Sequence, residues 1–275
     1  LQLQYNRETQ ETTLRAMGKM HLEILEETMR TRFSIPCTFS KPQLIYRETL
    51  LRPTEGFVAY TMPKPCWAIM NLYMEPLPPG SGVQFESRVS PRDIALRYQH
   101  QVENALPLAL KQGMRGFQVT DIRITLVGGN HHEIHTHPLD FVVATPMAVM
   151  DGLQRGGTRL LEPVLHCCIQ VPETYAGKVM SDVNKMRGEV QSTQSMGETC
   201  RIEALVPAVN ALPYADELLQ MTGGRGGMTT RVHAWQYAPP DVNDTLPRHG
   251  VNPLDTAKYI LAARSALEGG IFDLE

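Results

Sequence analysis

The clearest pattern in the chain is an alternating stretch that leads into a cluster of histidines. Between residues 121 and 127, apolar Ile122, Ile124 and Leu126 alternate with polar residues, the two-residue period of a half-buried strand. Residues 139–153 follow with a helical pattern, and the glycines just before position 130 are assigned to the loop between them. Four of the nine histidines lie in this tip loop (residues 130–137). Because a strand and a helix would hold the loop at one end of a domain, we predict that it is a contact site.

Residues 1–40 have the pattern strand, helix, strand. Residues 1–5 and 34–39 alternate, and residues 17–32 carry Leu22, Leu25 and Met29 at helical spacing. Two strands and one helix are too little to close a core, so we predict the second half of a small α+β domain in a fragment of a longer protein. Lys41-Pro42 marks its end, because the residue before a proline favours extended backbone.

Residues 41–159 form the next predicted α+β domain. Its expected strands lie at 43–51, 57–61, 66–74 and 83–89. Ser90-Pro91 predicts the start of a helix that ends at Gly113. Pro107 is expected to kink or split that helix, and Pro146 to interrupt the helix that follows the tip loop.

Residues 160–240 alternate between strand and helix patterns in the order β-α-β-β-α-β, the ferredoxin-like split motif. The predicted elements lie at 164–171, 172–186, 189–196, 199–206, 211–220 and 228–237. Residues 241–275 begin irregular and rich in proline, and residues 254–267 then have near-helical spacing. We expect this terminal helix to pack back on the rest of the chain, which is thus predicted to be a multidomain α+β protein.

The composition is that of an ordinary globular protein, with 42% hydrophobic residues, 20% charged residues and a net charge of −3. This charge gives no support for a nucleic-acid-binding protein, but it leaves room for a local RNA contact made by a few residues. No apolar run reaches the roughly 18 residues that cross a bilayer, so no membrane partner is expected. Five cysteines without C-x-x-C spacing predict buried, reduced thiols in a cytoplasmic protein.

The histidines of the tip loop are open to three interpretations. His132, His135 and His137 could bind zinc, but their spacing is not H-E-x-x-H and no helix places two of them on one face. A solvated polar loop is the simplest alternative. The third is RNA contact, since imidazole can stack on an unpaired base and hydrogen-bond to its edge.

The chain contains no G-x-x-x-x-G-K-[ST] phosphate loop, and no catalytic residue or metal ligand is predicted. The glycine-rich stretch at 223–227 precedes a strand, so it lacks the helix N-terminus that cradles phosphate. It is either a tight turn or a backbone that approaches RNA closely, with Arg225 on a phosphate.

Four short motifs follow one another at suitable spacing: AMGKMHLEIL at residues 16–25, KPQLIYRET at 41–49, LEP at 161–163 and GRG at 224–226. They resemble domains III, IV and V of the elongation factor G superfamily of translational GTPases. Within that superfamily, PCWA at 65–68, PLPPGSGVQFES at 76–87 and GFQVTD at 116–121 resemble the tetracycline ribosomal-protection proteins. The terminal helix also resembles one that those proteins add, whereas the tip loop is closer to elongation factor G.

The resemblance implies partial domain III at 1–40 (ferredoxin-like), domain IV at 41–159 (of the ribosomal-protein-S5 type), domain V at 160–240 (ferredoxin-like) and a C-terminal extension at 241–275. It implies a cytoplasmic, monomeric partner of the ribosome, whose GTP and Mg²⁺ bind in a G domain N-terminal to Leu1; these residues themselves would hold no cofactor and catalyse nothing. Two functions stay open: release of tetracycline, or translocation or recycling without drug resistance. The implied contacts with small-subunit RNA are Asn130, His131, His132, Glu133, Ile134, His135, Thr136 and His137, and those with large-subunit RNA are Gly224, Arg225 and Gly226.

Overall fold

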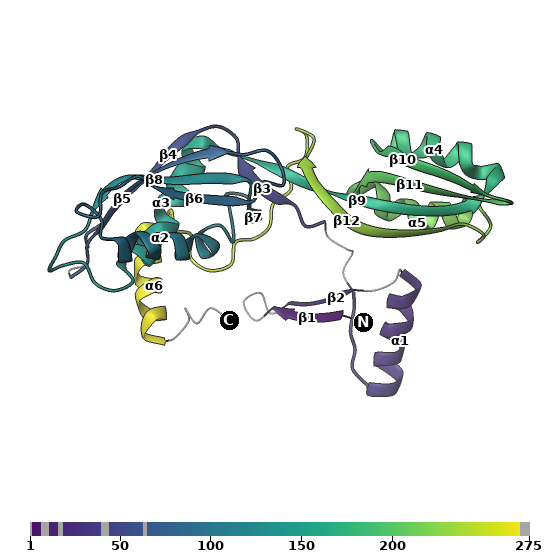
Figure 1. Ribbon diagram of the computed structural model, residues 1–275. Helices are drawn as coiled ribbons and strands as arrows, with labels where there is room; N and C mark the ends of the chain where they lie inside the picture. The colour runs from purple at the N-terminus through teal and green to yellow at the C-terminus, as the bar shows by residue number, and fades with distance from the viewer. Residues whose placement is uncertain (1, 7–10, 16–18, 40–43, 63–64, 270–275) are drawn as a thin grey trace. The chain divides into compact units, whose positions relative to one another are not determined.

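The computed structural model describes residues 2–6, 11–15, 19–39, 44–62 and 65–269. The chain divides into two compact units, residues 1–44 and residues 45–275. Figure 1 shows that both units mix strands and helices, so the predicted multidomain α+β class is confirmed.

The first unit contains a hairpin and one helix. Strands β1 (Gln2–Asn6) and β2 (Glu11–Arg15) pair antiparallel, and α1 (Lys19–Phe33) follows. The predicted strand at 34–39 is wrong. Ser34 has a positive φ of 56° and the Ile35 amide donates to the carbonyl of Met29 at 3.0 Å, a turn that closes a helix C-terminus rather than opening a strand. Strand β2 was missed because it carries a single large apolar residue, Leu14.

A four-stranded sheet forms the first half of the second unit. Its order is β4-β5-β8-β6, with β6 parallel to β8 and the other pairs antiparallel. The strands are β4 (Thr54–Tyr60), β5 (Ala68–Pro76), β6 (Val83–Ser87) and β8 (Ile122–Asn130). Helix α3 (Asp140–Gly156) packs on β4 and β5, and α2 (Leu96–Ala109) packs against α3. The core between them is fully buried and includes Met70, Leu72, Ile124, Phe141 and Leu153.

Helix α2 begins later and ends earlier than the sequence predicts. Ser90 starts only an isolated turn, because its carbonyl accepts the amides of Asp93 and Ile94 while its hydroxyl accepts that of Arg92. The helix then runs from Leu96 to Ala109, short of Gly113. Neither proline breaks its helix: α2 and α3 are continuous across Pro107 and Pro146. Most of α3 is buried, and its packing outweighs one lost backbone hydrogen bond.

The second sheet has the order β10-β11-β9-β3-β7, with β12 also paired to β9. Its strands are β3 (Arg47–Leu50), β7 (Gln118–Val119), β9 (Thr158–Pro172), β10 (Glu189–Met196), β11 (Thr199–Pro207) and β12 (Gly227–Tyr237). Helix α4 (Ala176–Lys185), entered through the 3₁₀ turn η1 (Glu173–Tyr175), packs on β10 and β11. Helix α5 (Ala208–Met221) packs on β9 and β12. The predicted β-α-β-β-α-β order is confirmed.

Strand β9 is shared by the two halves of the second unit. Its first residues, 158–161, pair with β3, and its later residues pair with β11 and β12. The expected boundary between residues 159 and 160 therefore falls inside one continuous strand. Buried Glu162 follows in β9 and accepts two hydrogen bonds from Arg187 at 2.8 and 3.0 Å.

The terminal helix α6 (Thr256–Gly269) packs back on the chain, as predicted, and its neighbour is α3. Leading to it, the Leu246 amide donates to the carbonyl of Arg115, and Arg248 donates to the carbonyls of Gln112 and Gly113. None of the helices in the described ranges combines the length and apolar content of a membrane span. The five cysteines, all within the described part, are thiols. Cys66, Cys167 and Cys200 are buried as predicted, whereas Cys37 and Cys168 are only half-buried; Cys168 lines the open face of the sheet.

Candidate nucleic-acid interface

The tip loop lies at one end of the four-stranded sheet, where β8 turns toward α3 (Figure 1). The strand runs to Asn130, so the assignment of Gly128 and Gly129 to the loop is wrong. Gly129 pairs with Met70 at a φ of +138°, and a Cβ on it would lie 2.1 Å from the Ile69 carbonyl oxygen. The glycine therefore marks a close approach of two strands rather than a turn.

His132 organises the loop that follows. Its Nδ1 accepts hydrogen bonds from the backbone amides of Ile134 at 3.1 Å and His135 at 3.3 Å. Its own amide donates to the Thr136 hydroxyl at 2.8 Å, and its carbonyl accepts the Thr136 amide at 3.0 Å. Because Nδ1 acts as an acceptor, the proton of the neutral ring is on Nε2. The loop thus fixes His132 as a ring with an N–H donor at Nε2.

Trp67, from the connection between β4 and β5, ties the loop to the sheet. Its indole Nε1 donates to Asn130 Oδ1 at 2.6 Å, its amide donates to Asp140 Oδ2 at 3.0 Å, and its carbonyl accepts the Thr136 hydroxyl at 2.7 Å. Asp140, which is buried, also accepts the amide of His137 at 2.8 Å. Trp67 is thus a site residue that was not predicted from the sequence.

Three aromatic rings lie in succession at this end of the domain. The ring centroids of Trp67 and His132 are 5.5 Å apart, and those of His132 and His135 are 4.4 Å apart. Distances of this order allow stacked or tilted ring contacts. The array is half-buried, so its outer edges are available to a flat ligand.

The other two histidines of the tip loop hold the backbone in place. His131 Nδ1 lies 2.8 Å from the Asp93 carbonyl oxygen, and its ring lies 5.4 Å from that of Tyr98 in α2. His137 Nδ1 lies 2.8 Å from the carbonyl oxygen of His135. Since a carbonyl oxygen can only accept, both rings carry their proton on Nδ1.

Glu133 and Ile134 form the outermost part of the loop, and Ile134 is 76% exposed. Across the described ranges, no three His, Cys, Asp or Glu side chains are arranged to hold a metal ion. The Nδ1 atoms of three tip-loop histidines are engaged with backbone groups instead. The geometry therefore favours a contact made by ring faces and N–H groups over the zinc interpretation.

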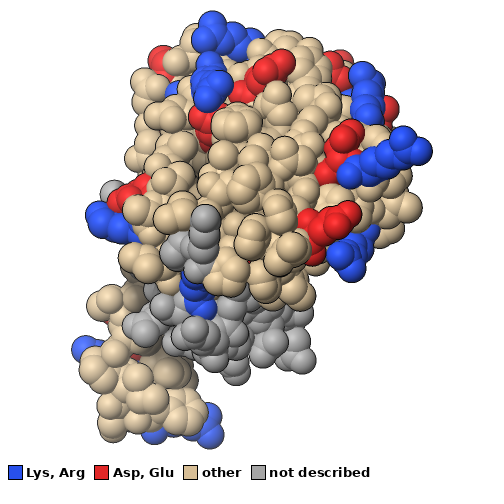
Figure 2. Space-filling view, turned by 90° about the vertical axis from the view of Figure 1, so that its left-hand side faces the viewer, with Lys and Arg blue, Asp and Glu red and all other residues tan. Residues whose placement is uncertain are grey.

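The tip loop carries one exposed carboxylate, that of Glu133. Seen from the left-hand side of Figure 1, the middle of the surface is formed by residues without formal charge, and Lys, Arg, Asp and Glu lie around its edge (Figure 2). Arg97 is a cation near the tip that the sequence analysis missed; it is exposed and its guanidinium lies 4.7 Å from the ring of Tyr98. Arg97 precedes Tyr98 in the chain, but the contact between the rings of Tyr98 and His131 has no sequence signal.

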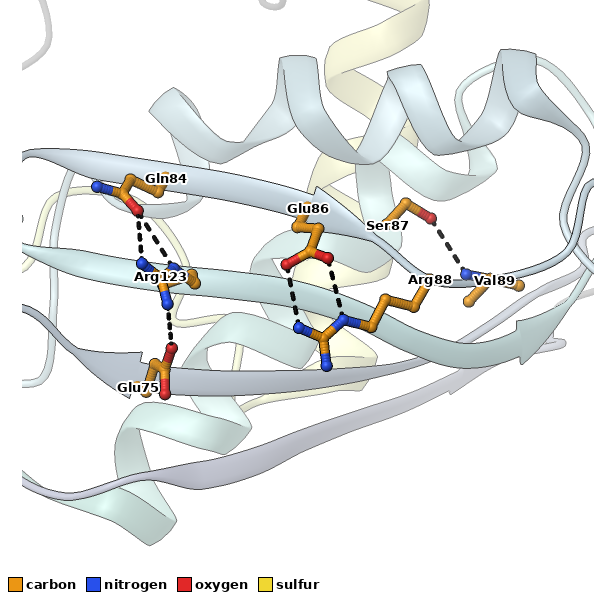
Figure 3. A network of polar contacts seen from close by, with 7 residues as sticks. All are labelled: Glu75, Gln84, Glu86, Ser87, Arg88, Val89 and Arg123. Atoms are coloured by element: carbon orange, nitrogen blue, oxygen red, sulfur yellow. Dashed lines mark hydrogen bonds and ion pairs between the residues drawn. The ribbon is translucent and has the colours of Figure 1, made fainter.

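The arginines on the outer face of the four-stranded sheet are balanced by acids. Arg123 donates to Glu75 at 2.8 Å and to Gln84 at 3.0 and 3.2 Å, and Arg88 pairs with Glu86 at 3.0 and 3.2 Å (Figure 3). An electrostatic RNA site needs unbalanced positive charge. This face therefore offers less to a phosphate backbone than its arginine content suggests.

The second predicted site, Gly224, Arg225 and Gly226, is the turn between α5 and β12. Gly224 has a φ of +79° and its amide donates to the Leu219 carbonyl. Arg225 is exposed, and its Nε donates to the carbonyl of Thr222 at 3.2 Å, while Gly226 donates to the Thr222 hydroxyl at 2.7 Å. The turn belongs to a different sheet from the tip loop, so the two predicted sites form separate surfaces.

Three family models match the chain in order: Elongation Factor G, domain III, at residues 1–41; Elongation factor G, domain IV, at 42–157; and Elongation factor G C-terminus at 159–246. Among curated relatives, the elongation factor G of Ehrlichia ruminantium is 35% identical over 243 residues, covering 86% of this chain and 35% of that protein. That of Paracoccus denitrificans is 30% identical over 247 residues, covering 88% and 35%.

A crystal structure of a protein from Thermus thermophilus superposes with a TM-score of 0.77 at 28% identity, covering 87% of this chain and 36% of that one. The chain thus has the fold of a translation-factor C-terminal region. It belongs to the elongation factor G superfamily and comprises domains III, IV and V. It spans about a third of the length of the curated relatives it matches.

Proposed function

We propose that this chain is the ribosome-contacting part of a translational GTPase, and that its tip loop contacts small-subunit RNA at the decoding region. The observation that carries the proposal is the fixed presentation of His132 at the end of domain IV, the domain that in this superfamily reaches toward the small subunit. GTP and Mg²⁺ would bind in the G domain of the full-length parent, which would act as a cytoplasmic monomer.

The chemistry of the tip suits an unpaired base better than a phosphate. Its exposed carboxylate, Glu133, would repel a phosphate, while Trp67, His132 and His135 supply ring faces. The Nε2–H of His132 would donate to an acceptor on a base edge, and sequence-tolerant stacking would add affinity. Arg97, beside Tyr98, is a source of one phosphate contact.

Arg225 would make a second contact, with large-subunit RNA. Its turn is anchored by Thr222, which accepts from Arg225 and Gly226. The exposed guanidinium would pair with a backbone phosphate.

Between the two open functions, the tip loop favours translocation or recycling, because its histidines resemble elongation factor G. Release of tetracycline is a second candidate, and the observation that favours it is α6, since a C-terminal helix is what the protection proteins add. Both functions would act through the same tip.

Two measurements on the full-length parent test the proposal. Co-sedimentation with ribosomes and a non-hydrolysable GTP analogue should show binding that weakens when His132 is replaced by Asn; equal binding by both proteins would count against a tip contact. Expression in a susceptible host separates the two functions: growth at higher tetracycline supports drug release, and unchanged tolerance supports translocation or recycling.

A further inference from the structure

The C-terminal helix is built into the core of domain IV. Ala263 of α6 is 4% exposed and belongs to the same buried cluster as Phe141 and Leu153, while Tyr259 and Ile260 pack against that cluster. Burial raises the pKa of Tyr259 to about 12. Figure 1 shows α6 beside α3, the helix that begins directly after the tip loop. The helix is therefore in a position to act on the tip.

Arg264, the next residue in α6, contacts the connection between β4 and β5. Its Nε donates to the Tyr60 hydroxyl at 3.0 Å, and its Nη2 donates to the Pro65 carbonyl at 3.3 Å. Tyr60 is the last residue of β4 and is 2% exposed, so its position is fixed by the core. The guanidinium thus joins a fixed point of the sheet to the backbone two residues before Trp67.

The connection between β4 and β5 also contacts the tip loop, through Trp67. Trp67 makes three hydrogen bonds, to Asn130, Thr136 and Asp140. Pro65 and Trp67 are separated only by Cys66, which is 1% exposed. A short piece of backbone with buried Cys66 at its centre therefore links Arg264 to Asn130 and Thr136 in the loop and to Asp140 at the start of α3.

We propose that α6 is a positioning element for the tip, and that Arg264 is its positioning residue. By tying Pro65 to Tyr60, Arg264 limits the positions that Trp67 can take, and Trp67 in turn holds the loop that presents His132. The consequence for ribosome binding rests on the proposed function of the tip; the effect on the tip itself does not. Pre-ordering the loop would lower the conformational entropy lost when it meets a partner.

The chain has two tryptophans, so Trp235→Phe leaves Trp67 as the reporter of the tip. In this background, Arg264→Met removes the donors but keeps an apolar stem. We expect acrylamide quenching of Trp67 and hydrogen exchange of the Ile134 and His135 amides to rise about twofold or more, as a locally opened segment does. Lys258→Met, on the exposed side of α6, is the matched control and should leave both unchanged.

Tyr60→Phe removes one acceptor of the Arg264 guanidinium, together with the hydrogen bond between the Tyr60 hydroxyl and Cys66. It serves if Arg264→Met fails to fold, and it should loosen the tip in the same direction. Unchanged quenching and exchange at the tip in Arg264→Met or Tyr60→Phe, with only a lower Tm, would overturn the proposal and make α6 a merely stabilising helix. A loosened tip in the full-length parent without weaker ribosome binding would uphold the positioning role and count against the proposed function of the tip.

Discussion

Trp67 donates a hydrogen bond of 2.6 Å to Asn130, a residue 63 positions further along the chain. The bond joins the connection before β5 to the last residue of β8. Asn130 opens the loop that His132 organises, and Trp67 reaches the rest of that loop through Thr136 and Asp140. The tip of domain IV is therefore built by two connections, only one of which carries the histidines.

Replacement of His132 should separate the fold of the loop from its contact with RNA. Asn at this position can accept the amide two residues on, as in an Asx turn, so His132→Asn should keep the loop but lose the ring. His132→Ala loses the ring and also the acceptor for the amides of Ile134 and His135, which should lower the free energy of unfolding by about 1 kcal/mol. Urea unfolding gives the stability, and co-sedimentation of the parent gives binding.

The expected order is that both variants bind ribosomes weakly, while only His132→Ala is measurably destabilised. Wild-type binding by His132→Asn would show that the ring makes no contact and that only the loop backbone matters.

The adjacent glycines at the end of β8 provide a matched pair. A Cβ at Gly129 would lie 2.1 Å from the Ile69 carbonyl oxygen, whereas at Gly128 its nearest neighbour would be the Cβ of Asn71 at 3.7 Å. Gly129→Ala should therefore destabilise domain IV by about 2–4 kcal/mol through strain and displaced strands. Gly128→Ala should stay within about 1 kcal/mol of wild type. Similar thermal unfolding of the two variants would contradict the strand pairing described for this region.

The buried carboxyl of Glu48 should make the free energy of unfolding depend on pH. It is fully buried and accepts the amides of Arg115 and Phe117 at 2.8 and 3.0 Å, but burial raises its pKa from the ordinary value of 4.5. A raised carboxyl pKa means that its stabilising contribution is complete below the unfolded value and is lost as the pH rises through the folded value. Glu48→Gln should thus gain stability relative to wild type as the pH rises from 4.5, by about 1.4 kcal/mol for each unit of the shift.

Urea unfolding at a series of pH values measures this difference. Glu86 is the control, because its hydrogen bond with Arg88 lowers its pKa. Its contribution is complete above pH 4.5 and is lost as the pH falls through the lowered pKa. Glu86→Gln should therefore lose stability relative to wild type as the pH rises toward 4.5, and the difference should then stay constant. A difference for Glu48→Gln that does not change with pH would refute the assignment.

Arg225 should contribute one phosphate contact in domain V. Arg225→Gln in the parent is expected to weaken ribosome binding and to reduce the slope of log affinity against log salt by about 1. Lys185→Gln, at the end of α4 and 71% exposed in its side chain, removes the same charge elsewhere in the domain. An equal change in both variants would show a general charge effect rather than a contact of this turn.

Much of the fold could be predicted where local pattern and final structure agree. The elements of domain V alternate clearly between apolar strands and helices, and packing leaves each of them in place. The helix start predicted at Ser90-Pro91 is wrong, because the hydrogen bonds of Ser90 close only a turn. Helix α2 starts five residues beyond Pro91, and its N-cap residue, Ala95, has no side-chain cap. The apolar face of α6 predicted that the helix packs against the chain, but the sequence did not indicate that its partner is α3.

Trp67 shows why the site was only partly predictable. The histidines are adjacent in sequence, so they were found together. The place of Trp67 beside His132 depends on the register of β5 and β8, which shifts at a bulge between Asn71 and Leu72. Register is set by pairing across the sheet, and no pattern within either segment indicates it.

Photo-crosslinking from position 134 tests the tip contact most directly. Ile134 is 76% exposed at the outer end of the loop, so a benzophenone amino acid there should leave the loop intact. With the full-length parent bound to ribosomes, we predict crosslinks to small-subunit RNA at the decoding region, and none there from the same group at Leu212 in α5. Crosslinks from position 134 that fall only elsewhere on a bound ribosome would contradict the proposed contact.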